Sequence, residues 1–519
     1  MKIQKNKIYT FLITAIAIFI SIYFWKVLHI PYQQNGIVGN YSINNYNALN
    51  DPIKYLLFIL LPTATFIFCK IFIENESLLN FLNFFKKENH NTDDSKINII
   101  FYLIFILVCI EFFSVEFPLH KLDIFHSGQK LNGAYKSYFD TSLWSGSYIT
   151  SGLFIEIFNG KLIWKIFSHQ SIGLLRLFDL ILILICKLVL LVLSFEISKT
   201  LNLQNSLKQI FFIILSLILL QFIDYDINSA DLIEYREIPI LIFLILVLFY
   251  IRSNSSNFRY SILLFSLLSV TTFFWSIDRA IVYNFLLFSL IIYLLINKDH
   301  QNPIIIIFFT LVFWGLSFLI LKEEFSFFLS STRSILSEIN NIHGIIHPIP
   351  FSDDADSTRA TKTLLTILFS VLISADLIIK NKNSNNKTIK IFLVLISLVS
   401  FFSYIYALGR SDGGHIKQAF GYPLIFFILL TLIFIFNLLD KINLRQNENY
   451  IKISVFVSII VFSQYIFNFN LNNIKSYKSN LTEYIYFEDE KFLTKDDINF
   501  VNQASYFLSS EKCIDLYTY

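Results

Sequence analysis

The sequence is short of several kinds of residue, and each shortage excludes a class of protein. Only four of its 519 residues are Cys and no CxxC spacing occurs, so neither a disulfide framework nor a cysteine metal site is indicated. The net charge is only +3 and the basic residues are scattered, which argues against nucleic-acid binding. There is no Walker motif, GxGxxG or GxSxG, so ATP-driven transport, dinucleotide redox chemistry and serine hydrolysis have no motif to support them.

Apolar residues, by contrast, make up 55% of the chain and include 58 Phe. A soluble core could not enclose that much apolar surface, so we expect most of it to face lipid. A helix that crosses ~30 Å of hydrocarbon needs ~20 mainly apolar residues, and the sequence supplies such runs repeatedly. The predicted spans are 9–29, 55–73, 97–115, 173–194, 209–223, 238–251, 260–275, 280–297, 303–321, 361–380, 391–408, 422–439 and 452–468.

These runs predict an all-α polytopic membrane protein with about 11–13 transmembrane helices, since a few runs are short. Lys2, Lys5 and Lys7 precede the first run, which lacks a small-residue cleavage site, so we expect a retained helix and not a signal peptide. The abundance of Ile, Phe, Asn and Lys is typical of an AT-rich bacterial genome. We therefore expect a multi-pass protein of the bacterial inner (plasma) membrane.

Basic residues in the short connections predict the orientation. We expect a cytoplasmic N-terminus, because most of the basic short connections then fall on the cytoplasmic side, as the positive-inside rule requires. The long connections 30–54, 116–172, 224–237 and 322–360, and the segment after 469, then lie on the outer side. The cytoplasmic loops hold Lys86, Lys87, Lys96, Lys199, Lys208, Arg252, Arg259, Lys298, Lys382, Lys387, Lys390, Lys441, Arg445 and Lys452.

The 116–172 connection carries the densest group of polar residues. Asp123, His126 and Gln129 are spaced by three, so they would share one face if this stretch is helical. A carboxylate, an imidazole and an amide at the membrane surface could abstract a proton or hold a cation. Asp140 follows in the same connection.

Two later stretches of this connection, 152–158 and 161–167, are apolar enough to lie in the interface plane as amphipathic helices. The alternative is an ordinary interfacial loop whose Asp caps a helix and whose aromatic residues anchor it at headgroup depth. For the whole group of polar residues we favour a functional site.

Two tight outer turns are also charged. Asp278 and Arg279 join two spans almost directly, and charges so close to hydrocarbon cost ~2.5–3.5 kcal/mol each unless they are paired or face a cavity. A functional role and mutual neutralisation with outward snorkelling fit equally well. The second turn, 409–417, brings Arg410, Asp412 and His415 together among glycines, and we favour a ligand site there.

Other charged residues give weaker signals. His343 and His347 have i, i+4 spacing, but Gly344 lies between them, so a zinc site is weakly supported. A transporter would need charged residues near the bilayer midplane and two matching halves, and no internal repeat is evident. The intramembrane candidates are Asp376 and Lys187, with Asp179 about two turns before Lys187. We expect Lys187 and Asp179 to pair across helices as a structural element.

An acidic residue in a long outer loop, followed by interface helices and about ten further spans, resembles the GT-C superfamily of membrane glycosyltransferases. Asp123, in Leu122-Asp-Ile-Phe-His-Ser-Gly-Gln129, looks like the family's loop acid, and Arg410, Asp412 and His415 fall where such enzymes often contact the donor. The family acid usually follows the first helix, whereas Asp123 follows the third span, as an added N-terminal hairpin would explain. Asp51 in the first outer loop is the rival acid.

The resemblance implies a sugar donor carried on polyprenyl phosphate and a lipid or glycan acceptor at the outer face. Asp123 would act as general base with His126 beside it, and the sugar would be inverted in an in-line displacement. Gln129, Asp140, Asp278 and Arg279 would help to bind substrate. Arg410, with His415 or a divalent cation such as Mg²⁺ or Mn²⁺, would stabilise the leaving phosphate.

We expect three parts. Residues 1–96 form an N-terminal hairpin with a cytoplasmic loop, 97–468 form the GT-C-like catalytic module, and 469–519 form a small outer segment resembling part of an αβ domain. The rival functions are an O-antigen polymerase or ligase, which would have its dominant outer loop late in the chain, and a non-enzymatic lipid or solute transporter.

Overall fold

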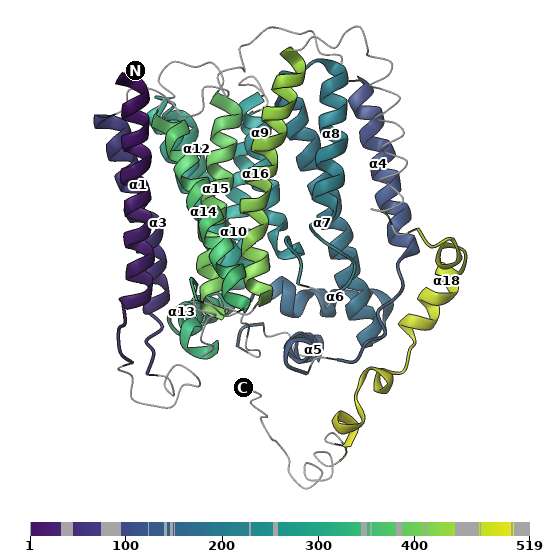
Figure 1. Cartoon of the computed structure of the whole chain (residues 1–519). Coiled ribbons are helices and arrows are strands. Elements are labelled where there is room, and N and C mark those ends of the chain that lie inside the picture. The colour runs from purple at the N-terminus through teal and green to yellow at the C-terminus, as the bar shows by residue number, and fades with distance from the viewer. Residues whose placement is uncertain are drawn as a thin grey trace.

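A computed structural model gives the architecture of most of the chain (Figure 1). It describes residues 2–32, 45–73, 95–122, 124–139, 143–145, 149, 151–227, 230–252, 258–343, 350–352, 355–379, 387–410, 413–441, 467, 469–499 and 502. The helices are α1 (Lys2–Val27), α3 (Asn50–Phe72), α4 (Ser95–Ser114), α5 (Ile124–Phe139), η2 (Phe154–Phe158), α6 (Asn159–Phe167), α7 (Ile172–Thr200), α8 (Asn205–Leu220), η3 (Tyr235–Glu237), α9 (Ile238–Arg252), α10 (Phe258–Trp275), α11 (Ile277–Ile296), α12 (Gln301–Leu321), α13 (Glu323–His343), α14 (Ala355–Ile379), α15 (Lys387–Arg410), α16 (Gly413–Lys441), α18 (Leu471–Ile485) and η6 (Asp489–Phe492).

The prediction of an all-α chain with many apolar spans is confirmed for this part of the chain, in which no strand occurs. In the described residues, eight helices are long and apolar enough to cross a membrane, namely most or all of α1, α3, α4, α7, α11, α12, α14 and α16. Three shorter apolar stretches, Asn205–Leu220, Ser261–Trp275 and Ile389–Ile405, coincide with further predicted spans. The last predicted span, 452–468, lies almost entirely outside the described residues.

The helices run up and down the bundle, and the additional short helices gather at one end of it. In Figure 1, α5, α6, α13 and α18 lie at the end opposite the N-terminus. The turn between α10 and α11 is at the same end, because the Ile277 N–H donates to the Ser151 carbonyl just before η2. The described parts of the long connections therefore share one end, as the predicted alternation of loops requires. We call this end of the bundle the loop end.

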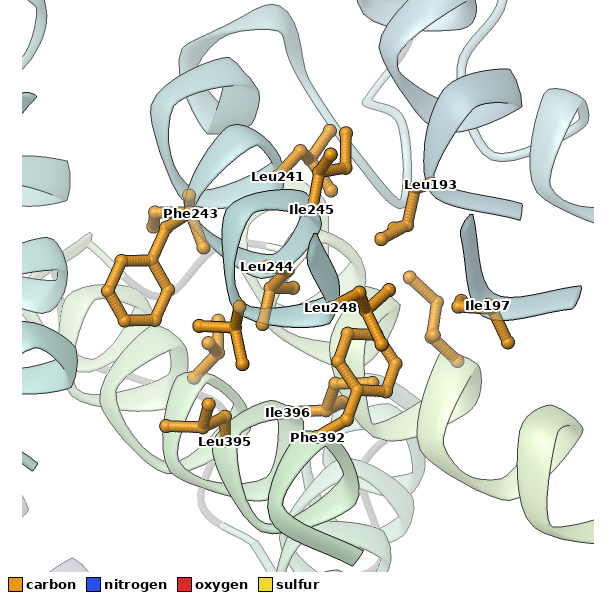
Figure 2. Close-up of a cluster of buried hydrophobic side chains, with 14 of the residues drawn as sticks. Leu193, Ile197, Leu241, Phe243, Leu244, Ile245, Leu248, Phe392, Leu395 and Ile396 are labelled. Carbon is orange, nitrogen blue, oxygen red and sulfur yellow. The ribbon is translucent and has the colours of Figure 1, made fainter. Parts of the chain in front are cut away.

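α9 lies at the centre of the bundle. It is apolar on all sides, as a helix surrounded by other helices must be. Leu241, Leu244 and Leu248 are buried where α9 meets the α7 and α15 side chains Leu193 and Phe392 (Figure 2). Lipid is as apolar as these residues, so close van der Waals packing is what favours this association over lipid contact. The result is a tightly packed scaffold for the elements at the loop end.

The predicted N-terminal hairpin is visible as α1 and α3 lying side by side (Figure 1). It is fixed to the rest of the bundle through α3. Tyr55 is fully buried, stacks on Phe401 of α15 at 5.2 Å and donates to the Phe401 carbonyl at 2.8 Å. Near the other end of α3, Lys70 forms an ion pair with Asp376 of α14 at 3.2 Å.

Lys187 and Asp179 both pair across helices, as expected of structural elements, but not with each other. Both residues lie on α7, and eight residues of helix separate them by ~12 Å along the axis, which is too far for direct contact. Lys187 instead pairs with Glu111 of α4, at 3.1 Å from both carboxylate oxygens. Asp179 pairs with Lys130 of α5 at 3.1 Å. Each charge thus joins α7 to a different neighbour.

Candidate functional site

The two segments of the 116–172 connection that we predicted to be interfacial are helical. η2 and α6 follow each other without a break and pack on α5 and on the start of α7. α6 buries Ile163 and Trp164, while Leu162 and Ile166 stay 41% and 64% exposed. This division gives α6 an outward apolar face, as an interfacial helix has.

The predicted catalytic group lies at the beginning of α5. Asp123 is outside the described residues, and α5 begins at the next residue, Ile124. The backbone of His126 and Gln129 is helical, so the three-residue spacing does place these positions on one face, although their side chains are outside the description. Asp140 also lies outside it.

Lys130, directly after Gln129, is a member of this site that the sequence analysis missed. Its ammonium lies 3.1 Å from Asp179 of α7 and donates to the Tyr235 hydroxyl at 2.9 Å. Burial alone would lower the pKa of Lys130, but the Asp179 carboxylate and Tyr235 outweigh burial and raise it above its usual range. A permanent positive charge is therefore fixed one helical turn from His126, and the His126–Lys130 spacing of i, i+4 could have indicated it.

Asp278 and Arg279 form the buried centre of a second polar group. Arg279 is only 2% exposed, so outward snorkelling is excluded. Its Nε lies 2.5 Å from Glu237 and its Nη1 lies 3.0 Å from Asp278, which confirms that the two turn residues pair with each other. Tyr422 of α16 donates to Glu237 at 2.9 Å. The predicted role of Asp278 and Arg279 in substrate binding stays a prediction.

Glu237 is another residue that the sequence analysis did not single out, because it directly precedes an apolar run and reads as the end of a loop. The segment 232–237 that contains it connects the two polar groups. Tyr235 reaches Lys130 and Asp179 on one side, Glu237 reaches Arg279 on the other, and Glu234 accepts a hydrogen bond from Gln418.

The predicted donor-contact residues lie where α15 ends and α16 begins. Arg410 is the last residue of α15, with its side chain outside the description, and Asp412 is outside it altogether. His415 lies half-buried in the first turn of α16. This helix meets the 232–237 segment directly, because a Cβ on Gly421 would collide with the Leu232 carbonyl.

The loop end thus holds a set of polar contacts, linked by the backbone of 232–237, that runs from α5 and α7 to α11 and α16. We call this set the polar network. Its members are Lys130, Asp179, Glu234, Tyr235, Glu237, Asp278, Arg279, Gln418 and Tyr422.

The network offers fixed charges and hydrogen-bond donors beside the predicted catalytic group. Among the described residues, no group of three or more His, Cys, Asp or Glu side chains could hold a metal ion. The divalent cation that the resemblance implies therefore finds no ligand set in that part of the chain. His343 ends α13 and His347 lies outside the described residues, so the weak zinc hypothesis gains no support.

A further contact fixes the later part of the 116–172 connection. Glu324, in the first turn of α13, accepts hydrogen bonds from the backbone N–H groups of Trp144 and Ser145 at 2.7 and 3.2 Å, and from the Ser145 hydroxyl. The Trp144 ring packs on Phe328 at 5.1 Å. This connection is therefore held from α13 as well as from α7.

No protein-family model, curated protein or solved structure matches this chain. The chemistry of the loop end must therefore be inferred from the residues of this chain alone.

Proposed function

We propose that this protein is a membrane glycosyltransferase of the GT-C kind, which moves a sugar from a polyprenyl-phosphate donor to an acceptor at the outer face. The strongest support is the polar network, which gathers α5, the 232–237 segment and the starts of α11 and α16 at one end of an apolar bundle. A polyprenyl chain lies among lipid and apolar helices, while its phosphate and sugar stay at headgroup depth. In the orientation predicted from the loop charges, the network lies at the end where such a substrate would present its reactive part.

In this proposal Asp123 takes the proton of the acceptor hydroxyl as that oxygen attacks the anomeric carbon. The bond between this carbon and the phosphate oxygen breaks, and the lipid phosphate leaves with the bonding electrons. In this proposal Arg410 and His415 stabilise the developing negative charge. Lys130, paired with Asp179 and hydrogen-bonded to Tyr235, holds α5 in place. No step is assigned to a metal ion.

Arg279 has a supporting role in this scheme. Its guanidinium already lies within 3.0 Å of two carboxylates and is almost completely buried, so it has little capacity to bind a phosphate as well. Its contribution is to hold the 232–237 segment against α11.

The test is the Asp123→Asn variant, assayed for sugar transfer from endogenous polyprenyl-phosphate sugars in membrane vesicles. Loss of a general base should lower the rate by ~10²- to 10⁴-fold while expression and gel-filtration behaviour stay normal. Asp496→Asn is the matched control, since Asp496 is an exposed acid at the same end of the protein. Unimpaired transfer by Asp123→Asn would sink the assignment.

A transporter is the second candidate, favoured by the buried ion pair of Lys187 and Glu111. Both side chains are less than 10% exposed, and the Lys187 ammonium also lies 4.3 Å from the Tyr225 ring centre. Ionisable groups buried between spanning helices are typical of ion or proton pathways. The Glu111→Gln variant separates the two candidates, because a transporter should lose substrate flux while a glycosyltransferase that still folds should keep its transfer rate.

A further inference from the structure

Residues 115–122 join α4 to α5 without regular secondary structure, so their backbone groups need partners from elsewhere. Several of those partners come from the C-terminal part of the chain. The Leu122 N–H donates to the Phe492 carbonyl at 2.7 Å, the Pro118 carbonyl accepts from the Tyr484 hydroxyl at 3.0 Å, and Phe117 stacks on Tyr484 at 4.8 Å. We call residues 471–493 the strap.

Arg176 on α7 completes this arrangement from the other side. It donates to the carbonyls of Pro118 at 3.0 Å and His120 at 2.7 Å, and it is 4% exposed. Its guanidinium carbon lies 4.7 Å from the ring centre of Phe492, a favourable cation–π distance. Phe492 thus covers the group that holds the carbonyls of the linker.

The strap is itself fixed to the beginning of α7. Asp489 accepts a hydrogen bond from the Ile172 N–H at 3.0 Å, where a carboxylate also interacts favourably with the helix dipole. A Cβ on Gly173 would collide with the Tyr484 carbonyl, so the two backbones are in direct contact. The strap therefore bridges α7 and the 115–122 linker and does not stand apart as a separate domain.

From these contacts we infer that the strap, with Phe492 and Arg176 at its centre, is a positioning device that fixes the 115–122 linker and with it the entry of the chain into α5, the helix that follows the candidate base Asp123 in the sequence. Arg176 and Asp179 lie one turn apart on α7 and hold the chain on both sides of Asp123, at the linker and at Lys130. The structural part of this inference stands without the proposed function, whereas its catalytic consequence rests on it.

The experiment compares Phe492→Ala with Lys491→Ala in the full-length protein in nanodiscs, using amide hydrogen exchange. Lys491→Ala is the matched control, because the Lys491 side chain is exposed and its contacts, with Glu488 and the Phe487 ring, do not include Arg176 or the 115–122 linker. Phe492→Ala should speed exchange in residues 117–130 about tenfold, with α11 unchanged. If Phe492→Ala does not fold, Phe492→Leu removes the ring while filling much of its volume, and the same local acceleration is expected.

Equal exchange of residues 117–130 in wild type and Phe492→Leu would overturn the inference, as would acceleration spread evenly over the bundle. In the transfer assay, a displaced base should lower kcat about tenfold at an unchanged KM for the donor. A fall in kcat and a rise in KM together would indicate general disruption and contradict positioning. Because exchange needs no substrate, it tests the strap even if Asp123→Asn keeps full activity.

Discussion

The two ends of the helical bundle handle buried charge differently. At the loop end, Arg279 meets two carboxylates and shares Glu237 with Tyr422, so the charges connect several elements. At the opposite end, Lys70 and Asp376 join α3 to α14, and Arg252 and Glu196 join α9 to α7 at 2.7 Å. A pair between two helices fastens them together. A network that joins loops and helix ends forms only when all of these elements pack together. Such a network can therefore hold the residues of a binding or catalytic site in a fixed arrangement.

The largest expected effect comes from removing the cation of the loop-end network. Arg279→Met leaves Glu237 and Asp278 buried without their shared partner and should destabilise the protein by ~3–5 kcal/mol. Unfolding by SDS in mixed micelles measures the change. Arg333→Met, which removes an exposed arginine from α13, is the control and should cost little. A loss below ~1 kcal/mol for Arg279→Met would contradict a central role for this guanidinium.

A somewhat smaller effect is expected for the Lys70–Asp376 pair, because each single variant there breaks one buried ion pair and not two. Lys70→Met and Asp376→Leu should each cost ~3 kcal/mol, but the double variant should cost much less than their sum, because it leaves no buried charge. The same double-mutant cycle on Arg279→Met and Glu237→Leu should recover less stability. Asp278 would still lack its Arg279 partner, and the Tyr422 hydroxyl would still lack its Glu237 acceptor. If both double variants recovered the same stability, the distinction between an isolated ion pair and a network would be contradicted.

The apolar runs allowed much of the fold to be predicted, because the thickness of the bilayer sets their length. The run 303–321 became α12, Gln301–Leu321, and the run 280–297 became α11, which begins directly after the break at Ser276. The sharing of one end by the described long connections also followed from the loop charges, because each span must reverse the direction of the chain.

The partners of buried charges could not be predicted, because tertiary packing chooses them. Glu111 is a single acid inside an apolar run, and nothing local indicates that it meets Lys187. Lys130 looked like an ordinary surface lysine until α7 placed Asp179 beside it. Within the candidate site, Asp278, Arg279 and the start of α16 could be identified from the sequence. The roles of Glu237 and the strap became visible only in the folded structure.

The smallest effect is expected for a substitution of Glu324, the α13 residue that contacts Trp144 and Ser145 at the loop end. Burial opposes ionisation there, but hydrogen bonds from the Ser145 hydroxyl and the backbone of residues 143–145 outweigh burial and hold the pKa of Glu324 below its ordinary value. A lowered pKa means that the carboxylate's contribution is complete above the unfolded pKa, near 4.5, and is lost as the pH falls through the folded pKa.

Glu324→Gln should therefore be less stable than wild type by about 1 kcal/mol or less at pH 7, because water screens this half-exposed site, and the difference should shrink as the pH falls below 4.5. Thermal unfolding in detergent at both pH values measures it. The neighbouring Glu323→Gln is the matched control, since Glu323 is exposed, and it should show little difference at either pH. A stability gap between Glu324→Gln and wild type that stays constant from pH 7 to pH 3 would mean that shape, and not charge, anchors Trp144 and Ser145 to α13.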